Sequence, residues 1–214
     1  QRRDAIGIVE GIVGQRRFSI HVKGQANHAG TTPMGLRQDA LAAASRIVLA
    51  VEEMARCHPG DPVATVGRLE VWPNAANVVP GSVSMTVDIR DLDPAVLDQL
   101  VSCLQDELES IGLATGCAIR LEPQFQVSPT PADALVMATI ESVAEDLGLS
   151  MSRLPSRASH DAQEIGRRWP MGMIFVPSRE GLSHSAAEFT SDSQCLEGTA
   201  VLLHTLERLD RVLS

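Results

Sequence analysis

The chain has 214 residues, a length that allows one or two compact domains. Hydrophobic residues make up 44% of it and charged residues 21%, which is ordinary for a globular protein and argues against disorder. The 27 acidic residues outnumber the 18 lysines and arginines, and the net charge of −9 argues against nucleic acid as a partner. No apolar run approaches the roughly 18 residues of a membrane span, so no membrane association is expected.

The start of the chain and its cysteines bear on the cellular compartment. The opening residues, QRRDAIGIVEGIVG, contain Glu10 and three glycines, which interrupt any signal-peptide core. The four cysteines are scattered and form no CxxC pair: Cys57, Cys103, Cys117 and Cys195. We therefore expect reduced, mostly packing cysteines in a cytoplasmic protein.

Residues 16–126 alternate between strand and helix patterns. Polar and apolar side chains alternate over 17–23, 62–71, 82–90 and 117–122, as in half-buried strands. Apolar residues recur at helical spacing over 36–56 and 97–111, with Thr32-Pro33 and Asp93-Pro94 as expected helix starts and Gly112 as the expected second end. The order β-α-β-β-α-β predicts a ferredoxin-like sandwich, an antiparallel four-stranded sheet with two helices on one face.

The pattern changes after the linker-like stretch Ser128-Pro129-Thr130-Pro131. Helices are expected over 132–147, from about 160 and over 192–213, with a short strand near 151–154. The continuous apolar run Met171–Val176 suits a strand buried on both faces. Two strands are too few for a stable sheet, so this second unit is expected to be part of a larger α/β domain. The predicted fold class is α/β (α+β).

Three of the six histidines lie in loops of a composition typical of functional sites. His28 occupies GQANHAGTTPM, where small residues let the backbone approach a ligand, although the imidazole could instead cap neighbouring backbone groups. His160 and Asp161 stand at an expected helix start, which can bind a carboxylate or only stabilise the aspartate. His184 follows the apolar run, where α/β sheets place ligand-binding loops, and an imidazole there suits a zinc-type ion.

Two further polar residues complete the candidate set. Asn77 lies in the proline-bounded loop WPNAANVVPG, and Arg90 projects from the polar face of the strand over 82–90. An arginine can hold a substrate carboxylate bidentately, but surface pairing with Asp88 or Asp91 is the alternative. The five residues do not make a complete catalytic set, and the sequence contains no GxSxG elbow, P-loop or dinucleotide fingerprint.

Six strings in the chain, taken in order, carry a family resemblance: HAGTTPM, PNAANVVPG, DIRDLD, SHDA, MIFVPS and GLSHSAAEFT. Together they resemble the N-carbamoyl-L-amino-acid hydrolase, allantoate amidohydrolase and β-ureidopropionase family of the dinuclear-metal aminoacylase and carboxypeptidase clan. The resemblance implies a metal-dependent hydrolase of a linear amide or ureido C–N bond, with a carboxylate-bearing ureido compound as its substrate. It also implies two divalent metal ions, zinc or manganese, with nickel and cobalt as alternatives.

The resemblance further implies a domain organisation. Residues 1–12 would end a catalytic-domain segment, residues 13–127 would form a βαββαβ lid and dimerisation domain, and residues 128–214 would be the C-terminal segment of the catalytic α/β domain. A homodimer would form through the lid. Because the family's other metal ligands and its general base precede this region, the chain is expected to be a C-terminal fragment without activity of its own. The alternative is an isolated dimerisation or binding module.

The resemblance also assigns roles to the candidate residues. His28 would reach the active site of the opposite subunit and polarise the scissile carbonyl, and His184 would be the last metal ligand. Substrate would be bound by Asn77, Arg90 and His160. The chain reads SRASHDA where the family usually reads SGAGHDA, so Arg157 and Ser159 replace glycines and leave the substrate within the group open.

Overall fold

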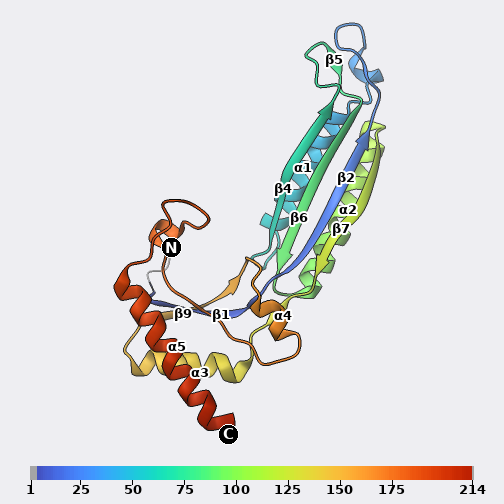
Figure 1. The fold of residues 1–214 in the computed structure, drawn as a ribbon. Coiled ribbons are helices and arrows are strands. Elements are labelled where there is room, and N and C mark those ends of the chain that lie inside the picture. The colour runs from blue at the N-terminus through green and yellow to red at the C-terminus, as the bar shows by residue number, and fades with distance from the viewer. Residues whose placement is uncertain (1–3, 214) are drawn as a thin grey trace. The chain divides into compact units, whose positions relative to one another are not determined.

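The computed structural model of the chain describes residues 4–213. These residues contain ten β-strands and five α-helices, shown as a ribbon in Figure 1. They divide into two compact units, one formed by residues 4–13 together with 129–213 and the other by residues 14–128.

The unit of residues 14–128 is an antiparallel four-stranded sheet with two helices on one face (Figure 1). Its strand order is β4-β6-β2-β7, and every neighbouring pair is antiparallel. The βαββαβ order that the pattern predicts is present, and in chain order the elements are β2 (Gly14–Lys23), α1 (Ala40–Arg56), β4 (Val63–Trp72), β6 (Ser82–Asp91), α2 (Pro94–Thr115) and β7 (Ala118–Val127).

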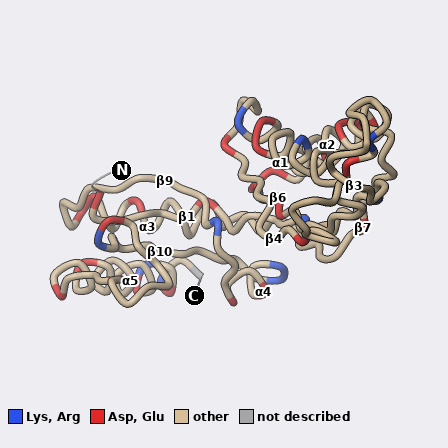
Figure 2. Tube along the Cα trace, turned by 90° about the horizontal axis from the view of Figure 1, so that it is seen from above, with Lys and Arg blue, Asp and Glu red and all other residues tan. Residues whose placement is uncertain are grey.

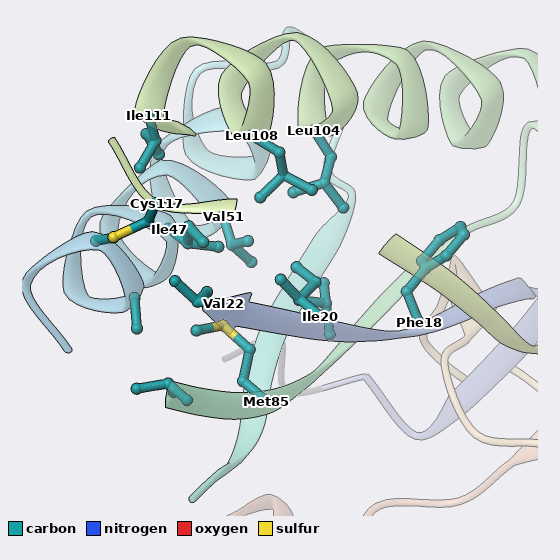
Figure 3. Close-up of a cluster of buried hydrophobic side chains, with 14 of the residues drawn as sticks. Phe18, Ile20, Val22, Ile47, Val51, Met85, Leu104, Leu108, Ile111 and Cys117 are labelled. Atoms are coloured by element: carbon teal, nitrogen blue, oxygen red, sulfur yellow. The ribbon is translucent and has the colours of Figure 1, made fainter. Parts of the chain in front are cut away.

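The core of this unit lies between the sheet and the two helices (Figure 3). Strand β6 alternates along its length, because every second side chain points to the helices and is buried. Buried side chains from both helices and the two central strands meet there: Ile20, Val22, Ile47, Val51, Met85, Val87, Leu104 and Leu108. The opposite face of β2 and β6 is consequently left to polar side chains.

The helix boundaries differ from those that the sequence suggests. A short 3-10 turn, Met34–Leu36, precedes α1, and the helix begins after Asp39, whose carboxylate accepts two backbone N–H hydrogen bonds of 3.0 Å. Thr32-Pro33 therefore does not start the helix, since Asp39 caps it instead. Helix α2 continues past Gly112 and ends at Gly116, whose φ of 67° is the left-handed conformation of a helix C-cap.

Two short strands, β3 (Asn27–His28) and β5 (Val78–Val79), pair beyond one end of this sheet (Figure 1). At the base of the loop that carries β3, the Gly24 N–H donates to the Gly81 carbonyl at 2.9 Å. A Cβ on Gly24 would stand 2.0 Å from the carbonyl oxygen of Gln38. Close backbone contacts therefore hold the base of this loop, and they require glycine at position 24.

The second unit is built around β1 (Ile6–Ile12). Strand β9 (Met151–Ser156) runs parallel to it on one side, and β8 (Thr130–Pro131) and β10 (Ile174–Phe175) run antiparallel on the other. Helices α3 (Ala134–Asp146) and α5 (Asp192–Leu213) supply the rest of a small core, and α4 (Ala162–Gly166) is a single short turn. The core residues are Ile6, Ile8, Ile140, Val143 and Val201.

Two expectations for this unit were wrong. Its described part has four strands rather than two, because β1 and β8 were not recognised as strands. The run Met171–Val176 is not a strand buried on both faces: only Ile174 and Phe175 form β10, and both are half-buried. Strand β10 pairs only with β1 and ends the sheet on that side. An apolar run in the sequence does not distinguish such a strand from a central one.

No helix within residues 4–213 has both the length and the apolar character of a membrane span. Figure 2 shows acidic and basic residues interspersed on both units. All four cysteines lie in the described part of the chain as thiols, with Cys117 buried in the core and the other three exposed.

The core of residues 14–128 yields a test of stability. Leu104 is fully buried, so we expect Leu104→Ala to lower the free energy of unfolding by about 2–5 kcal/mol through lost burial and a residual cavity. Leu113, on the same helix, is 81% exposed, and Leu113→Ala should change stability by less than about 0.5 kcal/mol. Urea denaturation of both variants measures the difference, and equal losses would contradict this packing.

Candidate functional site

The loop around His28 fixes the tautomer of its imidazole. His28 is exposed on β3, and its Nδ1 accepts hydrogen bonds from the backbone N–H groups of Gly30 (3.0 Å) and Thr31 (3.2 Å). A neutral imidazole that accepts at Nδ1 carries its proton on Nε2. The backbone capping that the sequence allowed as an alternative is thus present, and it leaves Nε2–H as the donor. Polarising a carbonyl oxygen requires such a donor.

Further hydrogen bonds hold the backbone of this loop. The hydroxyl of Thr32 donates to the His28 carbonyl at 2.7 Å. Arg37, which is half-buried, donates from Nε to the Thr32 carbonyl (3.0 Å) and from Nη2 to the Ala29 carbonyl (2.5 Å). Arg37 therefore ties the two sides of the turn together. The sequence reasoning missed Arg37, because no local pattern tells which carbonyls a loop arginine will meet.

Asn77 lies beside His28 on the neighbouring segment. Its carbonyl accepts the Ala29 N–H at 2.9 Å, and the following residue, Val78, pairs with His28 in the β3–β5 ladder. Both His28 and Asn77 are exposed. The structure therefore brings these two predicted residues together at one end of the unit.

Arg90 lies at the opposite end of the same sheet. It pairs with Gln15 near the start of β2, whereas Ser82 pairs with Lys23 at the end of β2, next to the loop of β3. The eight residue-to-residue steps from Ser82 to Arg90 span about 26 Å at a rise of about 3.3 Å per step. Within one chain, Arg90 and Asn77 therefore cannot hold the same small carboxylate.

Arg90 belongs to a polar cluster on the face away from the helices. Its Nε donates to Oδ1 of Asp88 at 2.7 Å. The other carboxylate oxygen accepts from Nε (3.1 Å) and Nη2 (2.9 Å) of Arg17 and from the side-chain amide of Gln15. The pairing with Asp88 that the sequence allowed as the alternative is therefore present, although the side chain of Arg90 retains 29% of its exposure.

The ionisation of Asp88 reflects this cluster. Partial burial opposes its negative charge, but the hydrogen bonds from Arg90, Arg17 and Gln15 outweigh the burial and hold the pKa of Asp88 below its ordinary value. At neutral pH the cluster thus contains two guanidinium groups and one carboxylate.

His160 is held by its neighbours in the other unit. The hydroxyl of Ser156 donates to the Ala158 carbonyl at 3.0 Å. In the 2.9 Å contact between His160 Nε2 and Ser156 Oγ, the imidazole is therefore the donor. The ring centroid lies 5.9 Å from that of Phe175. Asp161 makes no side-chain capping hydrogen bond to α4. The side chain of Asp161 thus does not cap α4, and the ring of His160 presents Nδ1 rather than Nε2.

His184 lies in an exposed loop after β10. Its φ is 56°, which is uncommon for a residue with a side chain and recurs at ligand sites, and its N–H donates to Oε2 of Glu188 at 2.9 Å. Within residues 4–213, no three histidine, cysteine, aspartate or glutamate side chains gather as a metal-binding group. A catalytic zinc normally has three protein ligands, so the described residues do not by themselves fit a dinuclear centre.

Two hollows of the 14–128 unit do not contain the predicted residues. One of about 630 Å³ lies against the polar face of the sheet beside Lys23 and Trp72, and another of about 460 Å³ lies between α2 and β7. Neither is lined by His28, Asn77 or Arg90. His28 and Asn77 instead lie exposed on the surface of this unit, and Arg90 is half-buried.

Comparison with known proteins places the chain in a family. Residues 5–208 match Peptidase family M20/M25/M40. The chain belongs to this family. Among curated members, this M20/M25/M40 chain is 38% identical to the N-carbamoyl-L-amino acid amidohydrolase of Geobacillus stearothermophilus, over 95% of the chain and 50% of that protein. It is 39% identical to the allantoate amidohydrolase of Bacillus subtilis, over the same shares. The chain thus spans about half the length of the curated relatives it matches.

Solved structures of the family share the fold. The hydantoinase/carbamoylase family amidase from Burkholderia multivorans superposes with a TM-score of 0.91 at 38% identity, covering 95% of this chain and 49% of that one. AtUAH in complex with (S)-hydroxyglycine has a TM-score of 0.82 at 33% identity, covering 96% and 49%. The matches confirm the family resemblance of the sequence motifs and the mixed α/β fold class.

The hydrogen bonds of the His28 loop lead to a prediction about its imidazole. We expect nitrogen-15 NMR to show neutral His28 with an unprotonated Nδ1 and a protonated Nε2, because Nδ1 accepts two backbone N–H groups. Arg37→Lys keeps the charge but loses the fork that bridges two carbonyls, so it should produce a mixture of tautomers. Arg46→Lys, at an exposed position on α1, is the control and should change nothing. A protonated Nδ1 in the unchanged protein would refute the assignment.

The lowered pKa of Asp88 predicts an acid-dependent loss of stability. The stabilisation that ionised Asp88 gives the folded protein is complete above the pKa of an unfolded aspartate, about 3.9. It is lost as the pH falls through the lower pKa that Asp88 has in the folded protein. Asp88→Asn removes this contribution, so the stability difference between the two proteins should be constant from about pH 7 to 5 and shrink below about pH 4. Urea denaturation over a pH series measures the difference, and a gap that widens on acidification would show the sign to be wrong.

Proposed function

We propose that the whole protein is a metal-dependent amidohydrolase that cleaves a linear amide or ureido C–N bond of a carboxylate-bearing substrate. Membership of the family supports this, as do relatives named N-carbamoyl-L-amino acid amidohydrolase and allantoate amidohydrolase. The observation that carries the proposal is the placement of His28 and Asn77 at one end of the sheet and Arg90 at the other. An N-carbamoyl amino acid and allantoate are the substrate classes we consider.

The separation of these residues favours an active site built from two protomers. In a two-fold homodimer formed through residues 14–128, His28 and Asn77 of one protomer would complete the site of the other, where Arg90 lies. Two apolar side chains of the same loop support this, because Met34 and Leu36 are 76% and 74% exposed and would be covered by a second protomer.

The side chains have complementary roles in hydrolysis. Attack of water on the substrate carbonyl produces a tetrahedral oxyanion, and Nε2–H of His28 would donate to that oxygen; similar donors contribute about 3–4 kcal/mol in other enzymes. Arg90 of one protomer and Asn77 of the other would bind the carboxylate and orient the substrate. His160 would contact the substrate as well.

Two divalent ions would belong to the whole protein. When bound, such ions polarise a carbonyl and lower the pKa of water. His184 is the candidate ligand in this chain, and zinc or manganese, with nickel and cobalt as alternatives, accept imidazole and carboxylate ligands. Since the described residues do not complete such a site, the remaining ligands would come from sequence outside this chain.

An isolated dimerisation or binding module is the second candidate function, because residues 14–128 have a complete sheet and a core of their own. A chain that acted only in this way would bind a second copy and turn over no ureido substrate. A cytoplasmic location remains a prediction from the sequence.

Mixing variants of the full-length protein tests the proposed two-protomer site. His28→Ala and Arg90→Ala should each lower kcat/KM about 100-fold or more, through loss of the carbonyl donor or of the carboxylate partner. A heterodimer of the two variants has one intact site and one site lacking both residues. Random mixing should therefore restore about a quarter of wild-type activity.

A matched mixture provides the control for this experiment. His28 and Asn77 lie on the same loop pair, so a heterodimer of His28→Ala and Asn77→Ala has one defect in each site and should recover nothing. Recovery in the first mixture only is the expected result. No recovery in the first mixture, with dimers demonstrated by ultracentrifugation, would refute a site shared between protomers.

A further inference from the structure

Four polar side chains form a square on the helix-free face of the 14–128 sheet. In the register of the two central strands, Arg17 lies opposite Asp88 and Gln15 lies opposite Arg90. Strand β4 flanks β6 on the outer side and β7 flanks β2, so the square is not at a sheet edge. Hydrogen bonding on both sides therefore fixes the backbone beneath these side chains.

Asp88 is the centre of this square. Its Oδ1 accepts from Arg90, and its Oδ2 accepts from Arg17 and Gln15. Gln15 is only 6% exposed, and the guanidinium of Arg17 lies 5.9 Å from the ring centroid of Phe125. One carboxylate oxygen of Asp88 thus accepts from the buried amide of Gln15 and from Arg17. The other oxygen accepts from Nε of Arg90.

Holding Nε has a consequence for the direction of the Arg90 guanidinium. The group is planar with donors at fixed angles, so a charged hydrogen bond at Nε sets the orientation of the plane. The contact with Asp88 is made through Nε, so it fixes the direction in which the whole guanidinium faces. A side chain oriented in advance loses less conformational entropy when its ligand binds.

We propose that Asp88, held by Gln15 and Arg17, is a positioning residue that orients Arg90 for the carboxylate of the substrate. The proposal rests on the proposed function, in which Arg90 binds that carboxylate. Position 88 requires a charged acceptor rather than only a polar one, because an asparagine would place its amide donors against the donors of the neighbouring side chains.

The test compares two substrates of the full-length protein, an N-carbamoyl amino acid and its carboxamide, in which the carboxylate is replaced by a neutral amide. Asp88→Asn should raise KM for the carboxylate about tenfold and change kcat less than about twofold, because it disturbs orientation for binding. It should leave both constants for the carboxamide unchanged. In an Arg90→Ala background, Asp88→Asn should have less than about a twofold further effect, since the two residues act together.

A surface ion pair of the same spacing provides a matched control. Arg68 and Glu70 on β4 pair at 2.5 Å two residues apart, as Asp88 and Arg90 do on β6, but both side chains are exposed. Glu70→Gln removes the carboxylate of this pair and should leave the kinetic constants for both substrates unchanged.

If Asp88→Asn does not fold, Arg17→Gln replaces it as the test variant. It should raise KM for the carboxylate substrate about threefold and leave the carboxamide unaffected, because Asp88 loses one of its charged partners.

The possible outcomes separate this inference from the proposed function. A carboxylate-selective loss in Arg90→Ala without one in Asp88→Asn, or an equal loss of both substrates in Asp88→Asn, would overturn the positioning role and leave the proposed function standing. A wild-type protein that hydrolyses neither substrate, or an Arg90→Ala variant that loses both equally, would overturn the proposed function and this inference with it.

Discussion

The alternation of side chains along the two central strands determines where polar groups can lie in the 14–128 unit. In β6, Val87 and Ile89 point to the helices and are buried, so Asp88 and Arg90 must point to the other face. A shift of one residue would bury a carboxylate and a guanidinium against the helices and expose the apolar side chains. The apolar core thus fixes the register, and the register in turn assembles the cluster around Asp88.

The same sheet keeps the two groups of candidate residues apart. Ten residues of β2 pair with ten residues of β6 without interruption, so the strands cannot shorten to bring Arg90 towards His28. The separation is a property of the backbone rather than of side-chain rotamers. The proposed site, which uses both groups, would therefore be completed by a second chain, to which the hydrogen-bonded loop at the far end of the sheet would present His28.

Sequence patterns predicted the elements whose signal is local, and missed those that depend on distant partners. The strand over 82–90 and the stripe of α2 follow from spacing alone. Strand β1, IGIVEGI, lacks strict alternation and becomes a strand through pairing with β8, β9 and β10, which come much later in the chain. In the site, the contact between Asp88 and Arg90 followed from their two-residue spacing. The proximity of His28 to Asn77 and the bracing by Arg37 depend on loop conformation, which spacing does not encode.

The hydrogen bonds give three of the candidate side chains different donor and acceptor groups. His28 presents a donor at Nε2, because its Nδ1 is engaged by the backbone. His160 donates through Nε2 to Ser156, so its neutral ring has Nδ1 as an acceptor. Arg90 contributes a planar cation. A ureido compound with a carboxylate offers the complement of all three: a carbonyl oxygen that accepts, an N–H that donates and an anion.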